Sequence, residues 1–128
     1  MELIVLLGAE LDIQSAFNWF EQYRNGFGLK FLQELEVAYE YLTRHPDIGR
    51  LYANNRRRFL ISNFPFGIFY SVEGNRIVVS AVLDLRQDPD RIRERLRNER
   101  RCLRRSPNNK IGFIFLPKRV IFRECLRS

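Results

Sequence analysis

Four arginines and a tyrosine are the first candidates for chemistry on phosphate groups. They are Arg57, Arg58, Tyr70, Arg86 and Arg91. Guanidinium and phenolic hydroxyl groups can bind the phosphate oxygens of a nucleic acid such as RNA. They make a poor acid–base pair, because arginine stays protonated. The single histidine, His45, precedes a proline at the end of a helical pattern and is expected to be a surface residue rather than a base.

The composition argues against a metal site and against a secreted or membrane protein. The two cysteines, Cys102 and Cys125, lie far apart, and one histidine is too few for a zinc site. No apolar run approaches the roughly 20 residues that a membrane span needs. The N-terminus carries Glu2 where a signal peptide has a basic residue. We therefore expect a cytoplasmic protein with no metal or other cofactor.

Positive charge is concentrated near the C-terminus. The net charge of the 128 residues is +7, but residues 1–85 contain 8 basic and 10 acidic residues, whereas residues 86–128 contain 14 and 5. Such asymmetry indicates an acidic partner, either nucleic acid or an acidic protein surface. The alternative is a solvated basic helix followed by a basic tail.

The N-terminal residues predict a strand followed by a helix. The apolar run Leu3–Leu7, ended by Gly8, is typical of a buried strand. Helical spacing follows, and Asp12 stands where it could cap or charge the first turn. The apolar stripe of this helix consists of Ile13, Ala16, Phe17, Trp19 and Phe20.

A second helix is predicted after Gly26 and Gly28, which allow left-handed backbone angles. It ends before Pro46, because the residue preceding a proline avoids helical angles. The short link between the two helices predicts an antiparallel helical hairpin. The apolar face of the second helix consists of Phe31, Leu35, Ala38, Tyr39 and Leu42.

Residues beyond the hairpin change to the period of strands. Strands are predicted at 57–62, 66–72 and 76–83, the last two joined by a tight turn at Glu73–Asn75. The predicted fold class is α+β: an N-terminal strand, an antiparallel helical hairpin packed on one face of an antiparallel β-meander, and a basic C-terminal helix.

The C-terminal third predicts a very basic helix that begins at Asp88-Pro89, since proline suits a first helical position. Ser106–Asn109 breaks this pattern, and Ile111–Leu116 is a candidate for a further strand. We predict one domain over residues 1–96 and a basic extension of unknown structure over residues 97–128.

Four motifs resemble those of the RelE/ParE superfamily of bacterial toxins, in the order and spacing of that family. The resemblance covers residues 1–96 and favours the ParE-like branch. The motifs are Trp19-Phe20-Glu21 with Gly26–Phe31, His45-Pro46-Asp47-Ile48-Gly49-Arg50, Arg57-Arg58-Phe59 with Phe64–Tyr70, and Arg86-Gln87-Asp88-Pro89.

The resemblance implies one of two activities. RelE-like members are ribosome-dependent mRNA endonucleases that use basic residues, with a Tyr or His near the end of the last strand. ParE-like members lack this set and act on DNA gyrase. If this chain were a nuclease, its catalytic residues would be Arg57, Arg58, Tyr70 and Arg86.

The chain departs from the nuclease pattern at two places. Phe66-Gly67 stands where nucleases often have an arginine, and Asp84-Leu85 ends the last strand without a His or Tyr. We therefore expect a toxin without catalytic residues, which inhibits DNA gyrase by binding and causes growth arrest, as in plasmid stabilization systems. An mRNA endoribonuclease is the alternative, and a degenerate toxin that acts only as a binding module is a third possibility.

The resemblance also implies partners and surfaces. A cognate antitoxin would neutralise the toxin in a hetero-oligomer, and antitoxin segments of this kind are often acidic. We expect target binding at Arg86, Arg91, Arg93, Arg95 and Arg97. We expect antitoxin binding on the meander at Phe59, Ile61, Phe66 and Phe69.

Overall fold

The computed structural model describes residues 2–53, 55–105, 112–116 and 119–123. Within these residues the helices are α1 (Leu7–Tyr23), α2 (Phe27–Arg44) and α3 (Pro89–Arg105). The strands are β1 (Glu2–Val5), β2 (Arg50–Ala53), β3 (Arg56–Leu60), β4 (Phe66–Glu73), β5 (Arg76–Asp84), β6 (Gly112–Leu116) and β7 (Arg119–Arg123).

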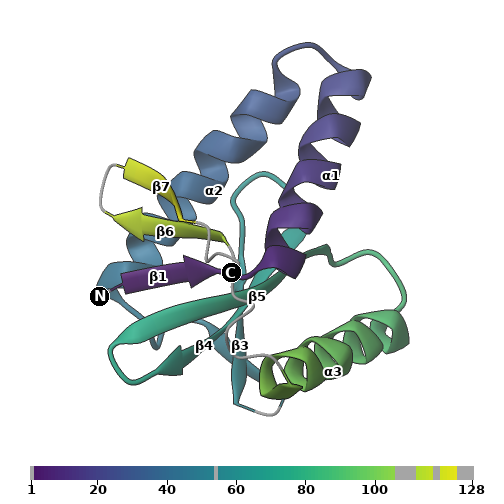
Figure 1. The fold of residues 1–128 in the computed structure, drawn as a ribbon. Helices are drawn as coiled ribbons and strands as arrows, with labels where there is room; N and C mark the ends of the chain where they lie inside the picture. Colours follow the sequence, from purple (N-terminus) through teal and green to yellow (C-terminus); the bar gives the residue numbers. More distant parts are fainter. Residues whose placement is uncertain (1, 54, 106–111, 117–118, 124–128) are drawn as a thin grey trace.

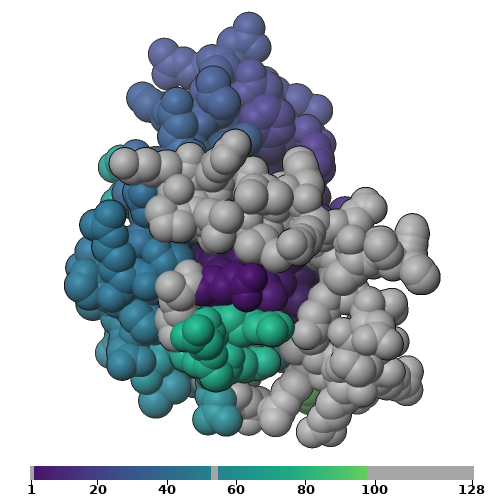
Figure 2. Space-filling model, turned by 60° about the vertical axis from the view of Figure 1, so that its left-hand side comes forward, coloured from purple at the N-terminus to yellow at the C-terminus, as the bar shows by residue number. Residues whose placement is uncertain are grey.

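All described strands belong to one sheet, in the order β2-β3-β4-β5-β1-β6-β7. Strands β2 to β5 form an antiparallel meander, as predicted. The N-terminal strand β1 lies parallel to β5, with Leu3 opposite Ile77. In Figure 2 the purple β1 accordingly lies beside the teal-green end of the meander. The predicted α+β class is confirmed.

The helices cover the two faces of the sheet unequally. Helices α1 and α2 pack on one face and enclose the main core, as predicted for the hairpin. Helix α3 packs on the opposite face over Phe69, Ala81 and Leu83 (Figure 1). The sheet is therefore buried on both sides in its centre, which explains why β5 is buried from Ile77 to Leu83.

The first helix begins earlier than predicted. Strand β1 ends at Val5, and Gly8 lies inside α1 instead of ending the strand. The Leu6 N–H still donates to the Val79 carbonyl, while the Glu10 N–H already donates to the Leu6 carbonyl. An apolar run that passes directly from strand to helix hides the boundary. The acid of the first turn is Glu10, so the role predicted for Asp12 is wrong.

The turn between α1 and α2 uses its two glycines differently. Gly26 has a φ of +85°, as predicted, but Gly28 is helical and is needed for space. A Cβ at Gly28 would lie 2.7 Å from the Phe17 carbonyl oxygen. The Glu21 carboxylate accepts hydrogen bonds from the N–H groups of Gly26 and Gly28, both at 2.9 Å, and so caps α2. Trp19, predicted to widen the buried stripe, is instead 56% exposed.

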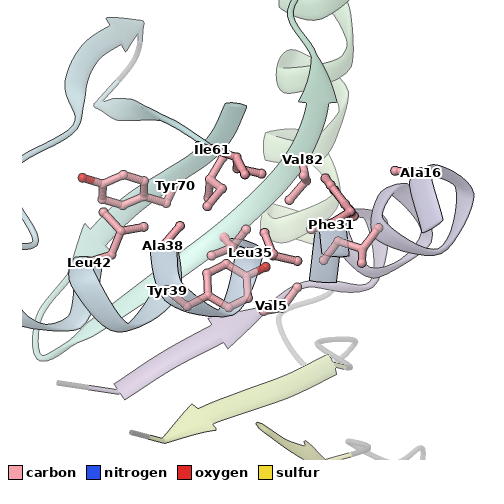
Figure 3. Packing of buried hydrophobic residues seen from close by; sticks show 14 of the residues in the cluster. Val5, Ala16, Phe31, Leu35, Ala38, Tyr39, Leu42, Ile61, Tyr70 and Val82 are labelled. Carbon is pink, nitrogen blue, oxygen red and sulfur yellow. The ribbon is translucent and has the colours of Figure 1, made fainter. Parts of the chain in front are cut away.

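The predicted buried face of α2 is confirmed. Figure 3 shows its Leu35, Ala38 and Leu42 facing Tyr70 and Ile61 of the meander. The helix ends at Arg44, before Pro46, as predicted. Strand β2 was not predicted, because four residues following the turn are too few to show a period.

The C-terminal prediction is confirmed in part. Helix α3 begins at Pro89, and the candidate strand at Ile111–Leu116 is present as β6, which pairs antiparallel with β1. The break predicted at Ser106–Asn109, like Ile111, lies outside the described residues. The boundary predicted between residues 96 and 97 falls within α3. None of the helices in the described ranges is long and apolar enough to cross a membrane.

Candidate functional site

Tyr70 and Arg57 hold the loop that follows α2. The Tyr70 hydroxyl donates to the Pro46 carbonyl at 2.8 Å and accepts from the Gly49 N–H at 3.0 Å. The Arg57 guanidinium donates to the carbonyls of Asp47 at 3.1 Å and Gly49 at 2.7 Å. These bonds satisfy polar backbone groups of the loop itself, which follows the end of α2. Both side chains therefore position the loop.

The environment of Tyr70 makes it a poor general base. The residue is fully buried, and burial raises the pKa of its hydroxyl above the ordinary value. The hydrogen bond from Gly49 and the charge of Arg57 oppose this rise without cancelling it. A tyrosine that ionises less readily than usual does not take up protons as a base at neutral pH.

Arg58 faces away from Arg57 and Tyr70. Its guanidinium lies 5.7 Å from the ring centroid of Tyr52, which packs edge-on against Phe69. Phe69 belongs to the cluster under α3, whereas Tyr70 belongs to the cluster under α1 and α2. Adjacent residues of a strand point to opposite faces, so Arg57 and Arg58 lie on opposite sides of the sheet.

Arg86, the remaining nuclease candidate, is paired with Asp84. Its guanidinium donates to the two carboxylate oxygens at 3.1 and 2.9 Å. The hydrogen bond from Arg86 lowers the pKa of Asp84, so this carboxylate remains charged. Gly67 is buried, and a Cβ there would lie 3.1 Å from Leu85 and 3.2 Å from Arg58. An arginine at that position would therefore not fit without displacing its neighbours.

Apolar and polar contacts attach α3 to the rest of the fold. Ile92 and Leu96 are buried against the sheet. The buried Arg56 guanidinium donates to the Leu96 carbonyl at 2.8 Å. Arg95 forms a two-pronged ion pair with Asp12 of α1, at 2.9 and 2.8 Å. Sequence reasoning did not identify the roles of Asp12 and Arg56, because both depend on partners that are distant in sequence.

The outer face of α3 presents the basic residues predicted to bind the target. Arg91, Arg93 and Arg97 are exposed, as is Arg86 just before the helix. Arg93 and Arg97 make exposed ion pairs with Asp90 and Glu94, three residues earlier. Arg95, also predicted to bind the target, is occupied by Asp12, and its side chain is only 29% exposed.

The residues predicted to bind an antitoxin are divided between surface and core. Phe59 and Phe66 are half-buried at the edge of the main core. Ile61 and Phe69 are buried in this structure, and Phe69 lies under α3.

Of the hollows beside the helical hairpin, two include residues predicted to bind a partner. One, of about 300 Å³, lies between α2 and β3 and includes Phe59. The other, of about 390 Å³, lies between α1 and the end of β5 and includes Trp19, Phe66 and Arg86. Among the described residues there is no group of three His, Cys, Asp or Glu side chains placed to hold a metal ion.

The chain has counterparts among known proteins, both in its fold and in its sequence family. The chain is similar to a structure of the chromosomal ParDE toxin–antitoxin system from P. aeruginosa, with a TM-score of 0.61 and 17% sequence identity. The match covers 66% of this chain and 96% of that chain, and it shows a common fold. No curated protein matches the sequence. The family model described as the ParE toxin of the type II toxin–antitoxin system parDE matches residues 4–89. The chain therefore belongs to the ParE toxin family of type II toxin–antitoxin systems, as its motifs predicted.

Proposed function

We propose that this protein stops growth by binding DNA gyrase, without catalysing a reaction, and that a cognate antitoxin neutralises it. Both events would take place in the cytoplasm, and toxin and antitoxin would form a hetero-oligomer. Two facts support this proposal. The chain belongs to the ParE family, and its candidate nuclease residues do not converge on one site.

The non-convergence argues against the nuclease alternative. Arg57 and Tyr70 are bound to the loop after α2, whereas Arg58 lies on the opposite face of the sheet. Arg86 lies beyond the end of β5 and is neutralised by Asp84. Cleavage of RNA at a ribose hydroxyl needs a base, an acid and a cation around one phosphate. The four residues do not supply that arrangement.

The surface that we assign to gyrase consists of Arg86, just before α3, and of the exposed Arg91, Arg93 and Arg97 on α3. We assign Arg95 to holding α3 in place, because its guanidinium is bound to Asp12. Helix α3 is held by its own Ile92 and Arg95 and by the hydrogen bond from Arg56 of β3. Its outer arginines therefore lie at defined positions, which favours specific binding to an acidic surface of the partner. An acidic segment of the antitoxin over the same face would block the target.

Gyrase inhibition can be measured directly. Purified toxin is expected to inhibit supercoiling of relaxed plasmid by gyrase, and adding the antitoxin should restore it. Unchanged supercoiling at a large molar excess of toxin, with the antitoxin absent, would argue against gyrase as the target. Codon-position cuts in mRNA, seen by primer extension after induction, would instead support the nuclease alternative. Absence of growth arrest would support the degenerate-toxin alternative.

Removing the exposed arginines of α3 should weaken inhibition. A variant with Arg91→Ser, Arg93→Ser and Arg97→Ser is expected to need about tenfold more toxin, since three exposed charge contacts at about 0.5 kcal/mol each sum to that factor. The matched control is Arg24→Ser, Lys30→Ser and Arg76→Ser, which removes the same charge from exposed positions elsewhere. Equal loss in both variants would show that net charge matters and that the α3 face does not.

A further inference from the structure

The hollow between α2 and β3 is a groove with an apolar floor. Val37 is 62% exposed and Tyr41 45% exposed, and Tyr41 stacks on Phe59 of β3, with ring centroids 5.8 Å apart. Leu60, which is 57% exposed, lines the same groove of about 300 Å³. Exposed apolar side chains gathered in one groove indicate a binding surface.

The sheet offers backbone groups along this groove. Strand β2 covers β3 only as far as Arg58. The Ile61 N–H donates to the Phe66 carbonyl of β4, so the neighbouring Leu60 directs its own N–H and C=O away from β4. No described strand lies beside Leu60 on that side. Its backbone donor and acceptor are therefore placed to pair with a strand that lies in the groove.

Acidic residues line the helix side of the groove. Glu34 and Glu40 lie three residues before and after Val37, so they flank it on the surface of α2. Among the residues that the structure describes, neither carboxylate has a salt-bridge partner. Arg44 also belongs to the lining, at the last residue of α2 and one turn beyond Glu40. Between Glu34 and Glu40 the groove therefore has the order acidic, apolar, acidic.

Strand β7, at the other edge of the sheet, has the complementary order of charges. It is the outermost strand beyond β6, and no described strand lies on its free side (Figure 1). Its residues are Arg119, Val120, Ile121, Phe122 and Arg123. Positions 119, 121 and 123 share one face of the strand, because alternate residues of a strand do. That face has the order basic, apolar, basic.

The two surfaces also agree in length. Glu34 and Glu40 are separated by about 9 Å along the helix axis. Arg119 and Arg123 are separated by about 13 Å along the strand. Glutamate and arginine side chains are long enough to bridge this difference, so both charge pairs can form around one apolar contact.

We propose that β7 of a second copy of this chain docks in the groove as an additional strand beside Leu60. Ile121 of that copy lies over Val37. Arg119 and Arg123 of that copy lie beside the two glutamates that flank Val37. The contact joins two different surfaces of the chain, so it can repeat from copy to copy. It depends neither on gyrase nor on the antitoxin.

The charges favour this arrangement over a symmetric contact between copies. Two β7 strands paired in register, in either direction, place arginine opposite arginine. Two grooves that face each other bring glutamates together. Of the three arrangements, only β7 in the groove pairs opposite charges, and it does so on both sides of an apolar residue. It also pairs the free edge of β7 with the open backbone at Leu60.

Sedimentation equilibrium of the purified wild-type toxin tests whether copies associate. The weight-average mass is expected to rise above that of one chain between about 1 and about 500 μM, the range of weak specific contacts. Salt at about 1 M should weaken the association, since it screens exposed charges. A wild type that remains monomeric over this range would overturn the proposal.

Two charge-reversed variants identify the surfaces that meet. Arg119→Glu with Arg123→Glu reverses the charge of β7. Glu34→Lys with Glu40→Lys reverses the charge of the groove. Each variant alone should associate at least about tenfold more weakly than the wild type. A mixture of the two should associate again, because the acidic β7 of the first fits the basic groove of the second. A mixture that stays monomeric would contradict the contact.

The matched control is Arg24→Glu with Lys30→Glu. It makes the same change of net charge as the β7 variant, at exposed positions that line a different hollow. This control should associate as the wild type does. An equal loss in the control would show that net charge governs association and that β7 does not.

Val37→Lys tests the groove if circular dichroism shows that a charge-reversed variant does not fold. It places a positive charge where Ile121 docks and should weaken association about tenfold. Leu29→Lys, 55% exposed on the same helix outside the groove, should have no effect. If Val37→Lys weakens binding of the antitoxin but leaves self-association unchanged, a second copy is refuted as the occupant of the groove.

Discussion

Replacing Asp12 by alanine is expected to lower the free energy of unfolding by about 2–4 kcal/mol. The Asp12 carboxylate accepts hydrogen bonds from Arg95 of α3 and, at 3.1 Å, from the Val82 N–H of β5. The side chains of Asp12 and Arg95 are only 14% and 29% exposed. Alanine would leave both donors without this acceptor, in a place that water reaches poorly.

The N–H of Val82 depends on Asp12 as its hydrogen-bond acceptor because β1 ends before it reaches Val82. Strand β1 pairs with β5 only as far as Val79, and the register of β5 against β4 shifts between Val79 and Ala81. The N–H of Val82 therefore lies on an edge of β5 where no described strand continues. A carboxylate from α1 takes the place of the missing strand and joins α1, β5 and α3 at one point.

The asparagine variant separates hydrogen bonding from charge. Burial raises the pKa of Asp12, and the hydrogen bond and charge of Arg95 do not fully offset the rise. Both carboxylate oxygens accept hydrogen bonds, one from Arg95 alone and the other from Arg95 and Val82. Asparagine keeps one acceptor oxygen but turns an N–H₂ group toward a donor, so we expect Asp12→Asn to lose less than Asp12→Ala, about 1–2 kcal/mol.

Urea denaturation followed by circular dichroism measures these differences. The control is Asp90→Ala, which removes the exposed partner of Arg93 and should cost about 0.5 kcal/mol or less. An Asp12→Ala variant as stable as Asp90→Ala would contradict the role assigned to Asp12. The loss should be accompanied by faster hydrogen exchange in α3, since Arg95 anchors that helix.

Replacing Gly49 by alanine is expected to cost about 3 kcal/mol, because the pocket around it has no room. A Cβ would lie 2.5 Å from the Tyr70 hydroxyl oxygen and 2.8 Å from the Tyr70 Cε1 atom. Tyr70 is fully buried and hydrogen-bonded at both ends of the loop, so its ring has nowhere to move. Gly49 does not have a positive φ, so the cost is one of crowding alone.

Three further variants make this prediction specific. Gly74→Ala places a Cβ in open space at a φ of +62° and should cost about 1 kcal/mol from backbone strain. Tyr70→Phe should cost about 2 kcal/mol, since the Pro46 carbonyl and the Gly49 N–H lose their partner. The double variant Gly49→Ala, Tyr70→Phe should lose less than the sum, because the closest contact is gone. Additive thermal or urea data would refute the contact.

Local patterns were sufficient for the elements whose apolar residues repeat without interruption. The spacing of Phe31, Leu35 and Leu42 together with Pro46 determines α2, because one face of a helix must be buried. The apolar runs on either side of the Gly74 turn likewise determine β4 and β5. The motifs that contain Gly49, Pro65 and Pro89 identified the family, since turns with fixed geometry constrain residue type.

The roles of charged residues were decided only by the tertiary structure. Asp12 binds groups 70 and 83 residues away, and no local pattern distinguishes such an acid from a helix cap. Phe69 was predicted to contact the antitoxin, but it is buried in this structure because α3 packs over it. Arg57 and Tyr70 bind the backbone of the loop after α2. Its polar backbone groups need hydrogen-bond partners, and side chains of the neighbouring strands provide them. The sequence by itself determined a ParE-like scaffold, and the packing of its elements decided which arginines remain exposed.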